Sequence, residues 1–326
     1  MQDPSWNISI QGEIDASAPG KVEAALKKAG ANGADVYIDS PGGSLAAAMM
    51  IGRMLRSDGA RSIVGRYNLV RTKSLMGQPE STYSPAGCFS SCTLAFLGGV
   101  YRYTISGSQF GVHRFSSRAG PSADDMDLAQ MVSATIISYI REMGASPALF
   151  DKWVQEGKDS IRLLTKAELD ELSVVNNGRL RPVGLIEAVE GGQILKGSQQ
   201  TRFGEGKAIF VCADRGILFY SFYEMNKARS DEILGGNWLH SLMIDDNATP
   251  LPKPAAEGYR SKTYSALFPL TRDQAWATGA SDKIGHAMQQ ARAAPTFIGY
   301  SIDLPKDAKS NVQKYIENCL SETRKK

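Results

Sequence analysis

The first third of the chain alternates between strand-like and helix-like patterns of hydrophobic residues. The segments NISIQGEI (7–14), ADVYIDS (34–40) and RSIVGRY (61–67) have the alternation or the short apolar run of strands. Between them lie APGKVEAALKK (18–28) and SLAAAMMIGRMLRSDG (44–59), in which apolar residues recur at helical spacing. This β-α-β-α-β order is typical of a parallel sheet covered by helices, so the pattern predicts an α/β fold.

The regular pattern breaks over residues 68–87, a polar segment that contains Pro79 and Pro85. This composition predicts a loop without secondary structure, and loops of such length are often functional. Because the segment directly precedes the motif GCFSSC, we expect it to form a lid over a site there. Further on, the spacing of Thr165 and Glu168 is that of a capping box and predicts the start of a helix.

Glycine is frequent between residues 178 and 206, where seven glycines indicate turns and a linker. We therefore predict a boundary near residue 200 between two domains, residues 1–200 and 201–326, as suits a chain of 326 residues.

The second domain has a hairpin pattern at 207–224 and a helical pattern at 309–322. A smaller α+β domain is expected there. It contains no catalytic motif, and the polar surroundings of His240 and His286 indicate surface positions.

Composition and charge narrow the class of protein. Hydrophobic residues make up 42% of the chain and charged residues 22%, as in a globular protein. The net charge of +3 is too small to predict a nucleic-acid partner. No apolar run reaches about 18 residues, so no transmembrane segment is expected. The first residues lack the basic and apolar regions of a signal peptide, so the protein is either cytoplasmic or an exported chain from which that peptide was removed.

The turn Ser40-Pro41-Gly42-Gly43 joins a predicted strand to a predicted helix. Glycines leave the backbone N–H groups unblocked, and such groups can bind an anion or a developing oxyanion. The alternative is a tight βα turn in which glycine serves geometry alone.

Two further motifs contain residues of nucleophilic catalysis. GCFSSC places Ser90 and Ser91 at the junction of a loop and an apolar helix, where a serine can be a nucleophile or simply an N-cap. FGVHRF places His113 in a strand, where it can be a general base or a satisfied core residue.

The order of these three motifs resembles that of the Clp protease proteolytic-subunit (ClpP) family of the crotonase superfamily. The resemblance covers roughly residues 7–189 and is specific in the three motifs. It implies an α/β fold in which β-α-β units wind into a ClpP/crotonase-like superhelix. It also implies a serine peptidase that needs no cofactor.

The resemblance also implies roles for single residues. The run TLAFL aligns with the family's apolar run after its nucleophile, which favours Ser91 over Ser90. His113 would be the general base, and the backbone N–H groups of Gly43 and Cys92 would form the oxyanion hole.

The family's third catalytic residue is an aspartate, and here the sequence departs from the family. Counting back from Thr165 as the family does leads to Ile161, and the nearest aspartate is Asp159. We expect Asp159 to orient His113, with Asp151 in reserve. If neither aspartate reaches His113, a Ser-His dyad or a non-catalytic protein remains.

Four cysteines permit two disulfides. Cys88 and Cys92 flank the serine turn and can form a disulfide that rigidifies it, although a thiolate there could itself be a nucleophile. Cys212 and Cys319 lie near the two ends of the second domain, so we predict a disulfide between them. No metal site is expected, because too few ligands accompany the thiols. Two disulfides favour a periplasmic or secreted protein, with a cytoplasmic location as the alternative.

Three functions compete. The first is a serine endopeptidase acting on a peptide or protein substrate, with a homo-oligomer left open. The second is an inactive relative that serves as a scaffold or peptide-binding module. The third, acyl-CoA chemistry of the crotonase type, needs no Ser-His pair and is disfavoured by His113. The related signal-peptide peptidases use a lysine base, for which Lys73 is the candidate.

Overall fold

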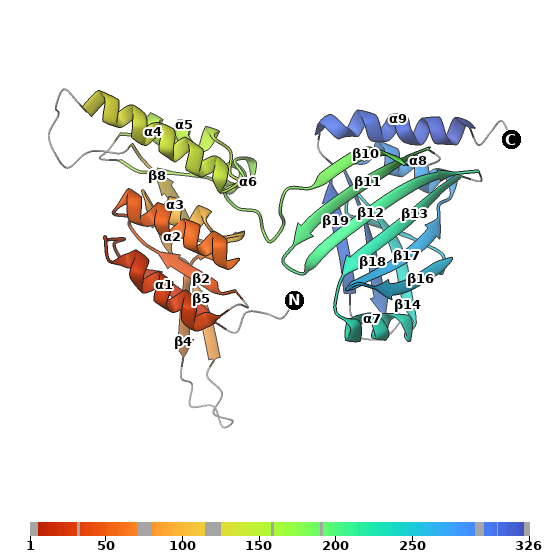
Figure 1. Cartoon of the computed structure of the whole chain (residues 1–326), viewed down its shortest axis with the longest axis horizontal. Coiled ribbons are helices and arrows are strands. Elements are labelled where there is room, and N and C mark those ends of the chain that lie inside the picture. The colour runs from red at the N-terminus through yellow and green to blue at the C-terminus, as the bar shows by residue number, and fades with distance from the viewer. Residues whose placement is uncertain are drawn as a thin grey trace. The chain divides into compact units, whose positions relative to one another are not determined.

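The computed structural model describes residues 6–30, 33–70, 80–114, 125–157, 160–189, 192–214, 216–290, 297–304 and 306–322. Lys73 and Asp159, two residues singled out in the sequence, lie outside these ranges. The chain divides into two compact units, and the division falls between Gly178 and Arg179 (Figure 1).

The N-terminal unit is a mixed α/β structure built on a parallel sheet, as the hydrophobic pattern predicts. The strands, in spatial order, are β1 (Asn7–Gln11), β2 (Asp35–Asp39), β3 (Arg61–Val64) and β7 (Tyr101–Thr104). Every neighbouring pair runs parallel. The connections β1–β2 and β2–β3 contain α1 (Ala18–Ala29) and α2 (Leu45–Asp58).

A second, three-stranded sheet lies beside the end of β2. Its strands, in spatial order, are β6 (Gly87–Phe89), β8 (Gln109–Val112) and β9 (Arg162–Leu163). The Ser40 N–H donates to the Gly87 carbonyl at 2.8 Å, and the Phe89 N–H donates to the Ser40 carbonyl at 3.0 Å. These two bonds hold β6, which leads into the turn formed by Ser90 and Ser91 (the serine turn), beside Ser40, which begins the Pro-Gly-Gly turn.

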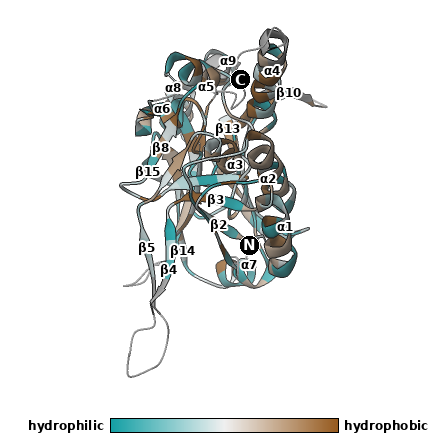
Figure 2. Cartoon of the chain, turned by 90° about the vertical axis from the view of Figure 1, so that its left-hand side faces the viewer, coloured by the Kyte–Doolittle hydropathy of each residue, from teal (hydrophilic) through white to brown (hydrophobic). Residues whose placement is uncertain are grey.

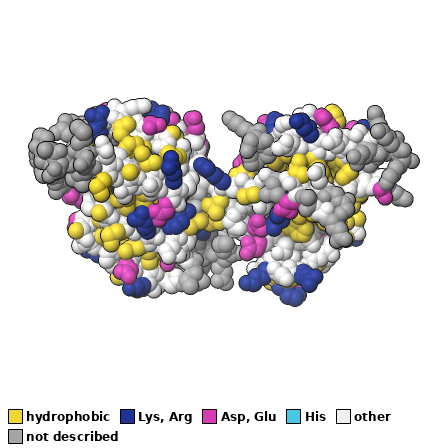
Figure 3. Space-filling view, turned by 45° about the horizontal axis from the view of Figure 1, so that its top comes forward, with side chains coloured by type: hydrophobic (Ala, Val, Ile, Leu, Met, Phe, Trp, Pro, Cys, Tyr) yellow, Lys and Arg dark blue, Asp and Glu magenta, His cyan; other side chains and the backbone are white. Residues whose placement is uncertain are grey.

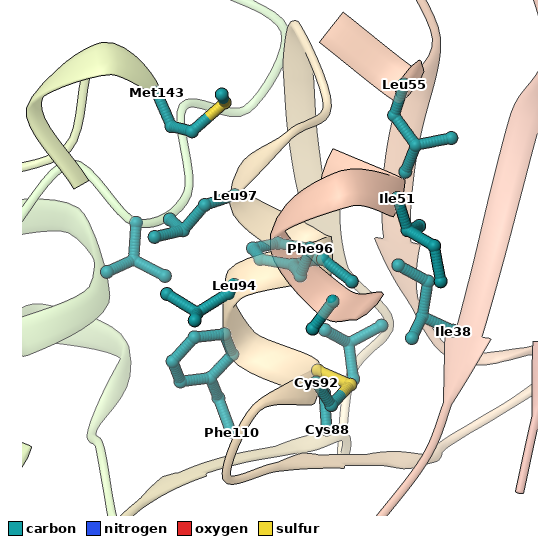
Figure 4. Close-up of a cluster of buried hydrophobic side chains, with 14 of the residues drawn as sticks. Ile38, Ile51, Leu55, Cys88, Cys92, Leu94, Phe96, Leu97, Phe110 and Met143 are labelled. Carbon is teal, nitrogen blue, oxygen red and sulfur yellow. A yellow bond between two sulfur atoms is a disulfide. The ribbon is translucent and has the colours of Figure 1, made fainter. Parts of the chain in front are cut away.

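The short helix α3 (Cys92–Leu97) is the centre of the core. All six of its residues have 0% exposed surface. Its Phe96 lies toward Ile51 of α2, its Leu94 lies beside Phe110 of β8, and its Leu97 lies on the side of Met143 (Figure 4). Burying each such side chain contributes about 1.5–3 kcal/mol, so the core fixes the orientation of α3 and of the serine turn before it.

Three more helices complete this unit: α4 (Asp125–Glu142), α5 (Ala148–Gln155) and α6 (Lys166–Glu171). The predicted capping box of α6 is confirmed. The Glu168 N–H donates to Thr165 Oγ1 at 3.2 Å, and the Thr165 N–H donates to Glu168 Oε2 at 3.0 Å.

The predicted loop over residues 68–87 is wrong at both of its ends. The strands β4 (Arg66–Val70) and β5 (Glu80–Ser84) pair in antiparallel register and extend away from the sheet (Figure 2). The Tyr67 and Tyr83 rings lie 5.4 and 5.7 Å from the Tyr37 ring. The pairing joins segments separated by several residues, so local periodicity within either segment does not reveal it.

The C-terminal unit contains two antiparallel sheets. The six-stranded sheet has the order β10 (Val183–Val189), β11 (Gly192–Thr201), β12 (Gly204–Ala213), β13 (Gly216–Glu224), β17 (Thr263–Pro269) and β16 (Ala256–Arg260). The four-stranded sheet has the order β15 (Asn247–Pro250), β14 (Trp238–Ile244), β18 (Lys283–Gln290) and β19 (Phe297–Asp303). The helices are α7 (Lys227–Leu234), α8 (Arg272–Ala280) and α9 (Lys306–Glu322).

The disulfide predicted between Cys212 and Cys319 is present. It joins β12 to α9 with a Cα–Cα distance of 5.6 Å. Because it closes a loop of 107 residues, it constrains the unfolded chain over most of this unit.

The domain boundary lies earlier than the predicted residue 200, because the glycine-rich region is sheet rather than linker. Gly197 lies in β11 and Gly206 in β12. A Cβ atom on Gly206 would lie 2.5 Å from the Tyr300 ring, so glycine at this position lets the ring pack against the strand.

The expectation that His240 and His286 lie at the surface is also wrong. Their side chains are 6% and 0% exposed, and their rings stack with 5.3 Å between centroids. His240 lies on β14 and His286 on the neighbouring strand β18. Both point inward because of strand alternation, which the local polarity of the sequence does not reveal.

Basic and acidic side chains both occur on the face drawn in Figure 3, in keeping with the small net charge. Among the described residues, every helix is too short or too polar to cross a membrane.

Candidate active site

The serine turn has a strained backbone at Ser90. Its φ of 56° lies in the left-handed region, which is uncommon for residues other than glycine. The Ser90 N–H donates to the Gly111 carbonyl at 3.0 Å. The Ser90 carbonyl accepts from the Thr93 N–H at 3.1 Å and from Thr93 Oγ1 at 2.6 Å. These three bonds fix the turn to β8 on one side and to α3 on the other.

Ser91 occupies the N-cap position of α3, but its side chain makes no capping hydrogen bond. The residue is 1% exposed, and its Oγ has no hydrogen-bond partner within the described chain. Buried hydroxyls are normally hydrogen-bonded, so this unpaired hydroxyl is unusual.

The Pro-Gly-Gly turn lies against the serine turn. Gly42 and Gly43 have φ values of 104° and 139°, which L residues rarely adopt. A Cβ atom on Gly42 would lie 2.8 Å from Ser90 Cβ and 3.1 Å from the Ser91 nitrogen. Glycine is therefore required here both for the backbone angle and for the close approach of the two turns.

Two main-chain bonds hold the Pro-Gly-Gly turn from its other side. The Ile14 N–H donates to the Gly42 carbonyl at 2.8 Å, and the Ser44 N–H donates to the Ile14 carbonyl at 2.7 Å. Gly43 itself is exposed, and its N–H donates no hydrogen bond to the residues that the structure describes. The Gly43 N–H is thus a fixed donor that is open to a ligand.

The Asp39 side chain connects β2 to two other strands. Its Oδ1 accepts from the Gly87 N–H at 3.1 Å, and its Oδ2 accepts from Arg66 Nε. The carboxylate therefore positions the start of β6, the strand that leads into the serine turn.

His113 follows β8 and is half-buried. Its Nδ1 lies 2.9 Å from the Arg114 carbonyl oxygen. A carbonyl can only accept, so in the neutral ring this contact selects the tautomer with the hydrogen on Nδ1 and the lone pair on Nε2. This tautomer is the one that a general base requires. In the described part of the chain, no hydrogen bond joins His113 to the hydroxyl of Ser90 or Ser91.

Arg114, which supplies that carbonyl, is bound to the end of α5. Its N–H donates to the Glu156 carbonyl at 3.2 Å. Its Nε and Nη2 donate to the Val154 carbonyl at 3.2 and 2.8 Å. A guanidinium group suits the unpaired carbonyls at the end of a helix. The result is a fixed orientation for the His113 ring.

The described residues give His113 no carboxylate partner. Asp159 lies outside them, and the exposed Asp151 on α5 has no hydrogen bond or ion pair with His113. The sequence did not indicate the role of Arg114, because a backbone carbonyl that acts as acceptor leaves no trace in residue type.

The predicted disulfide between Cys88 and Cys92 is confirmed. Both residues are fully buried, and the bond encloses Ser90 and Ser91. All four cysteines of the chain are in disulfides, so the alternative of a cysteine nucleophile is overturned.

No family model matches the chain, and no curated protein matches it. Among solved structures, the chain is similar to a mutant of the 1510-N membrane-bound stomatin-specific protease. The similarity covers 52% of this chain and 77% of that chain, with 18% identity and a TM-score of 0.39. At this level of likeness, the function has to be argued from the site itself.

Proposed function

We propose that the N-terminal unit is a serine endopeptidase whose nucleophile comes from the Ser90–Ser91 turn, with His113 as general base. The main support is that the Pro-Gly-Gly turn packs within van der Waals contact of the serine turn. The same serine turn is hydrogen-bonded to β8, the strand that ends directly before His113. We also propose that this unit follows the ClpP/crotonase-like superhelix that its motifs resemble.

In the proposed reaction, the serine Oγ attacks the carbonyl carbon of a peptide bond while its proton passes to His113 Nε2. The negative charge on the carbonyl oxygen is stabilised by main-chain N–H groups, for which the sequence assigns Gly43 and Cys92. Each such donor is typically worth about 3 kcal/mol of barrier. His113 then protonates the leaving amine as the C–N bond breaks. Water, activated by the same base, hydrolyses the acyl-enzyme.

The fixed tautomer of His113 supports this role. In a catalytic triad, an acidic residue normally keeps Nδ1 protonated and the ring oriented. Here the Arg114 carbonyl provides the same hydrogen bond. Asp159 remains the candidate for the third residue of the triad. Its contribution can be measured separately from that of the Arg114 carbonyl by substituting Asp159.

A non-catalytic peptide-binding module is the second candidate. The observation that favours it is the buried, unpaired Ser91 Oγ, which has no hydrogen bond to His113. In such a protein, the Gly43 N–H would bind a peptide carbonyl or carboxylate without any reaction.

A fluorophosphonate probe distinguishes these candidates. The peptidase should be labelled on the serine turn, and His113→Ala should slow labelling by at least about 100-fold, as expected for loss of a general base. Cleavage of a peptide library, followed by mass spectrometry, would identify the bonds that are cut. A folded wild-type protein that is neither labelled nor active on the library would contradict the peptidase and favour the binding module.

The two disulfides lead us to propose an oxidising compartment, the periplasm or the exterior of the cell. Labelling of intact cells with a thiol reagent that does not cross membranes, before and after reduction, would test this location.

A further inference from the structure

We propose that Ser90, rather than Ser91, provides the nucleophilic hydroxyl. This inference rests on the proposed serine peptidase function and specifies which side chain forms the acyl-enzyme.

Ser90 and Ser91 differ in their exposure to solvent. A nucleophilic oxygen has to approach a substrate carbonyl carbon to about 3 Å, so the oxygen has to be reachable from outside. Ser91 is 1% exposed, and its Oγ is buried without a hydrogen-bond partner in the described chain. Ser90 is partly exposed. Of the two residues, only Ser90 is open to solvent, so we infer that its hydroxyl is the one that meets a substrate without rearrangement of the core.

The direction of the Ser90 side chain supports the same choice. A Cβ atom built on Gly42 would lie only 2.8 Å from Ser90 Cβ. The Ser90 side chain therefore starts directly beside the Pro-Gly-Gly turn. The next residue of that turn is Gly43, whose exposed N–H is the proposed oxyanion donor. Ser90 therefore lies on the side of the serine turn from which the oxyanion would be stabilised.

The backbone of Ser90 also distinguishes its side chain from those of α3. At a φ of 56°, the side chain leaves the chain in a different direction from those of the helical residues that follow it. Strained residues of this kind persist where neighbours fix them, and they are concentrated at functional sites. Here Gly111 and Thr93 fix both sides of the Ser90 peptide unit through the hydrogen bonds described above.

The choice of Ser90 changes the oxyanion hole. The main-chain donor next to the nucleophile becomes the Ser91 N–H instead of the Cys92 N–H. The Ser91 nitrogen lies 3.1 Å from the position that a Cβ atom on Gly42 would take, on the same side as the Pro-Gly-Gly turn. In the reaction, the bond from Ser90 Oγ to the carbonyl carbon forms, the proton passes to His113 Nε2, and the leaving amine takes it as the C–N bond breaks.

Peptide mapping of the fluorophosphonate adduct on the full chain tests the assignment. We expect the adduct on Ser90. Ser90→Gly, which tolerates the positive φ, should fold and lose labelling by at least about 100-fold, as expected for loss of a nucleophile. Ser91→Ala, which removes only a buried unpaired hydroxyl, should still be labelled at Ser90. An adduct on Ser91, or labelling that survives in Ser90→Gly and disappears in Ser91→Ala, would overturn the proposal.

A second measurement does not depend on the peptidase function. With both disulfides intact, Ser90→Cys should react with iodoacetamide in the native state, whereas Ser91→Cys should react only after unfolding. A protected thiol at position 90 and a reactive one at position 91 would refute the choice of Ser90. If the thiols behave as expected but the wild-type protein is not labelled by fluorophosphonate, the proposed function fails, and the nucleophile assignment fails with it.

Discussion

At the scale of single residues, the site depends on three neighbouring positions with positive φ, of which only two are glycine. Gly42 and Gly43 adopt these angles at no steric expense, whereas Ser90 adopts its φ of 56° against a penalty of about 1–2 kcal/mol. The hydrogen bond that the Ser90 N–H donates to Gly111 and the bonds that its carbonyl accepts from Thr93 offset that penalty. The serine turn is therefore held in place by its neighbours rather than by its own conformational preference.

The first prediction concerns the partner of His113. Because its Nδ1 already donates to the Arg114 carbonyl, Asp159→Ala should slow fluorophosphonate labelling by less than about threefold, whereas His113→Ala should slow it by at least about 100-fold. Initial labelling rates at one probe concentration provide the measurement. If Asp159→Ala is as slow as His113→Ala, the protein uses a full triad, and the carbonyl is not a sufficient partner.

At the scale of elements, the capping box of α6 illustrates how one side chain combines several contacts. The Thr165 N–H donates to the Glu168 carboxylate and holds its pKa at about 2, and Lys152 and Arg162 contribute further. Burial acts in the opposite direction. The side chain is 21% exposed, so solvent screens part of this stabilisation.

The second prediction follows from the sign of that shift. A carboxylate whose pKa is lower in the folded state stabilises the protein above its unfolded pKa, and the contribution is lost as pH falls from about 5 towards 2. Glu168→Gln should therefore lower the free energy of unfolding by about 1 kcal/mol at pH 7. The difference from the wild type should vanish near pH 2. Denaturant unfolding at several pH values provides the test, and a constant difference would contradict it.

The third prediction compares the elements that the two disulfides join. In the chain-entropy account, a loop of 107 residues should contribute about 5 kcal/mol and a loop of four about 2 kcal/mol. The double variant Cys212→Ala/Cys319→Ala should thus lose more stability than Cys88→Ala/Cys92→Ala. Hydrogen exchange of each unit, measured on the full chain, reports the two losses separately. Equal losses would show that local packing outweighs loop length.

At the scale of the whole molecule, the two units differ in how deeply their described histidines are buried. The C-terminal unit buries His240 and His286, with Nδ1 of the first 3.2 Å from Nε2 of the second. Burial lowers the pKa of both rings, and a charge on His240 would lower the pKa of His286 further. The described histidine of the N-terminal unit, His113, is only half-buried.

The fourth prediction is that mild acid destabilises the C-terminal unit first. A histidine whose pKa is lower in the folded state favours folding above its unfolded pKa of about 6.5, and this contribution is lost as pH falls below that value. Between pH 6.5 and 5, the free energy of unfolding should fall by up to about 1.4 kcal/mol per pH unit for each ring. Hydrogen exchange at these pH values would show the loss in β14 and β18.

A matched variant separates this effect from general acid sensitivity. His286→Leu should be less stable than the wild type at pH 7.5, because it leaves the His240 nitrogen unpaired. Its stability should depend less steeply on pH between 6.5 and 5. An unchanged slope would assign the acid response to other groups.

The sequence by itself determined the features that depend on neighbouring residues. The α/β alternation, the capping box of Thr165 and Glu168, and the Pro-Gly-Gly turn follow from periodicity and backbone preference, which act over a few residues. Both disulfides could be predicted because four cysteines in such positions leave few pairings.

Only the tertiary structure decided which side chains are buried and which strands pair with each other. It pairs the strands β4 and β5, places β10 and β11 in the second unit, and turns His240 and His286 inward. It also buries Ser91 and leaves the adjacent Ser90 partly exposed. Residue type could not predict this difference, because both residues are serine. The physical reason is that burial and strand pairing are set by contacts between segments far apart in the chain, whereas propensity and turn chemistry act within a few residues.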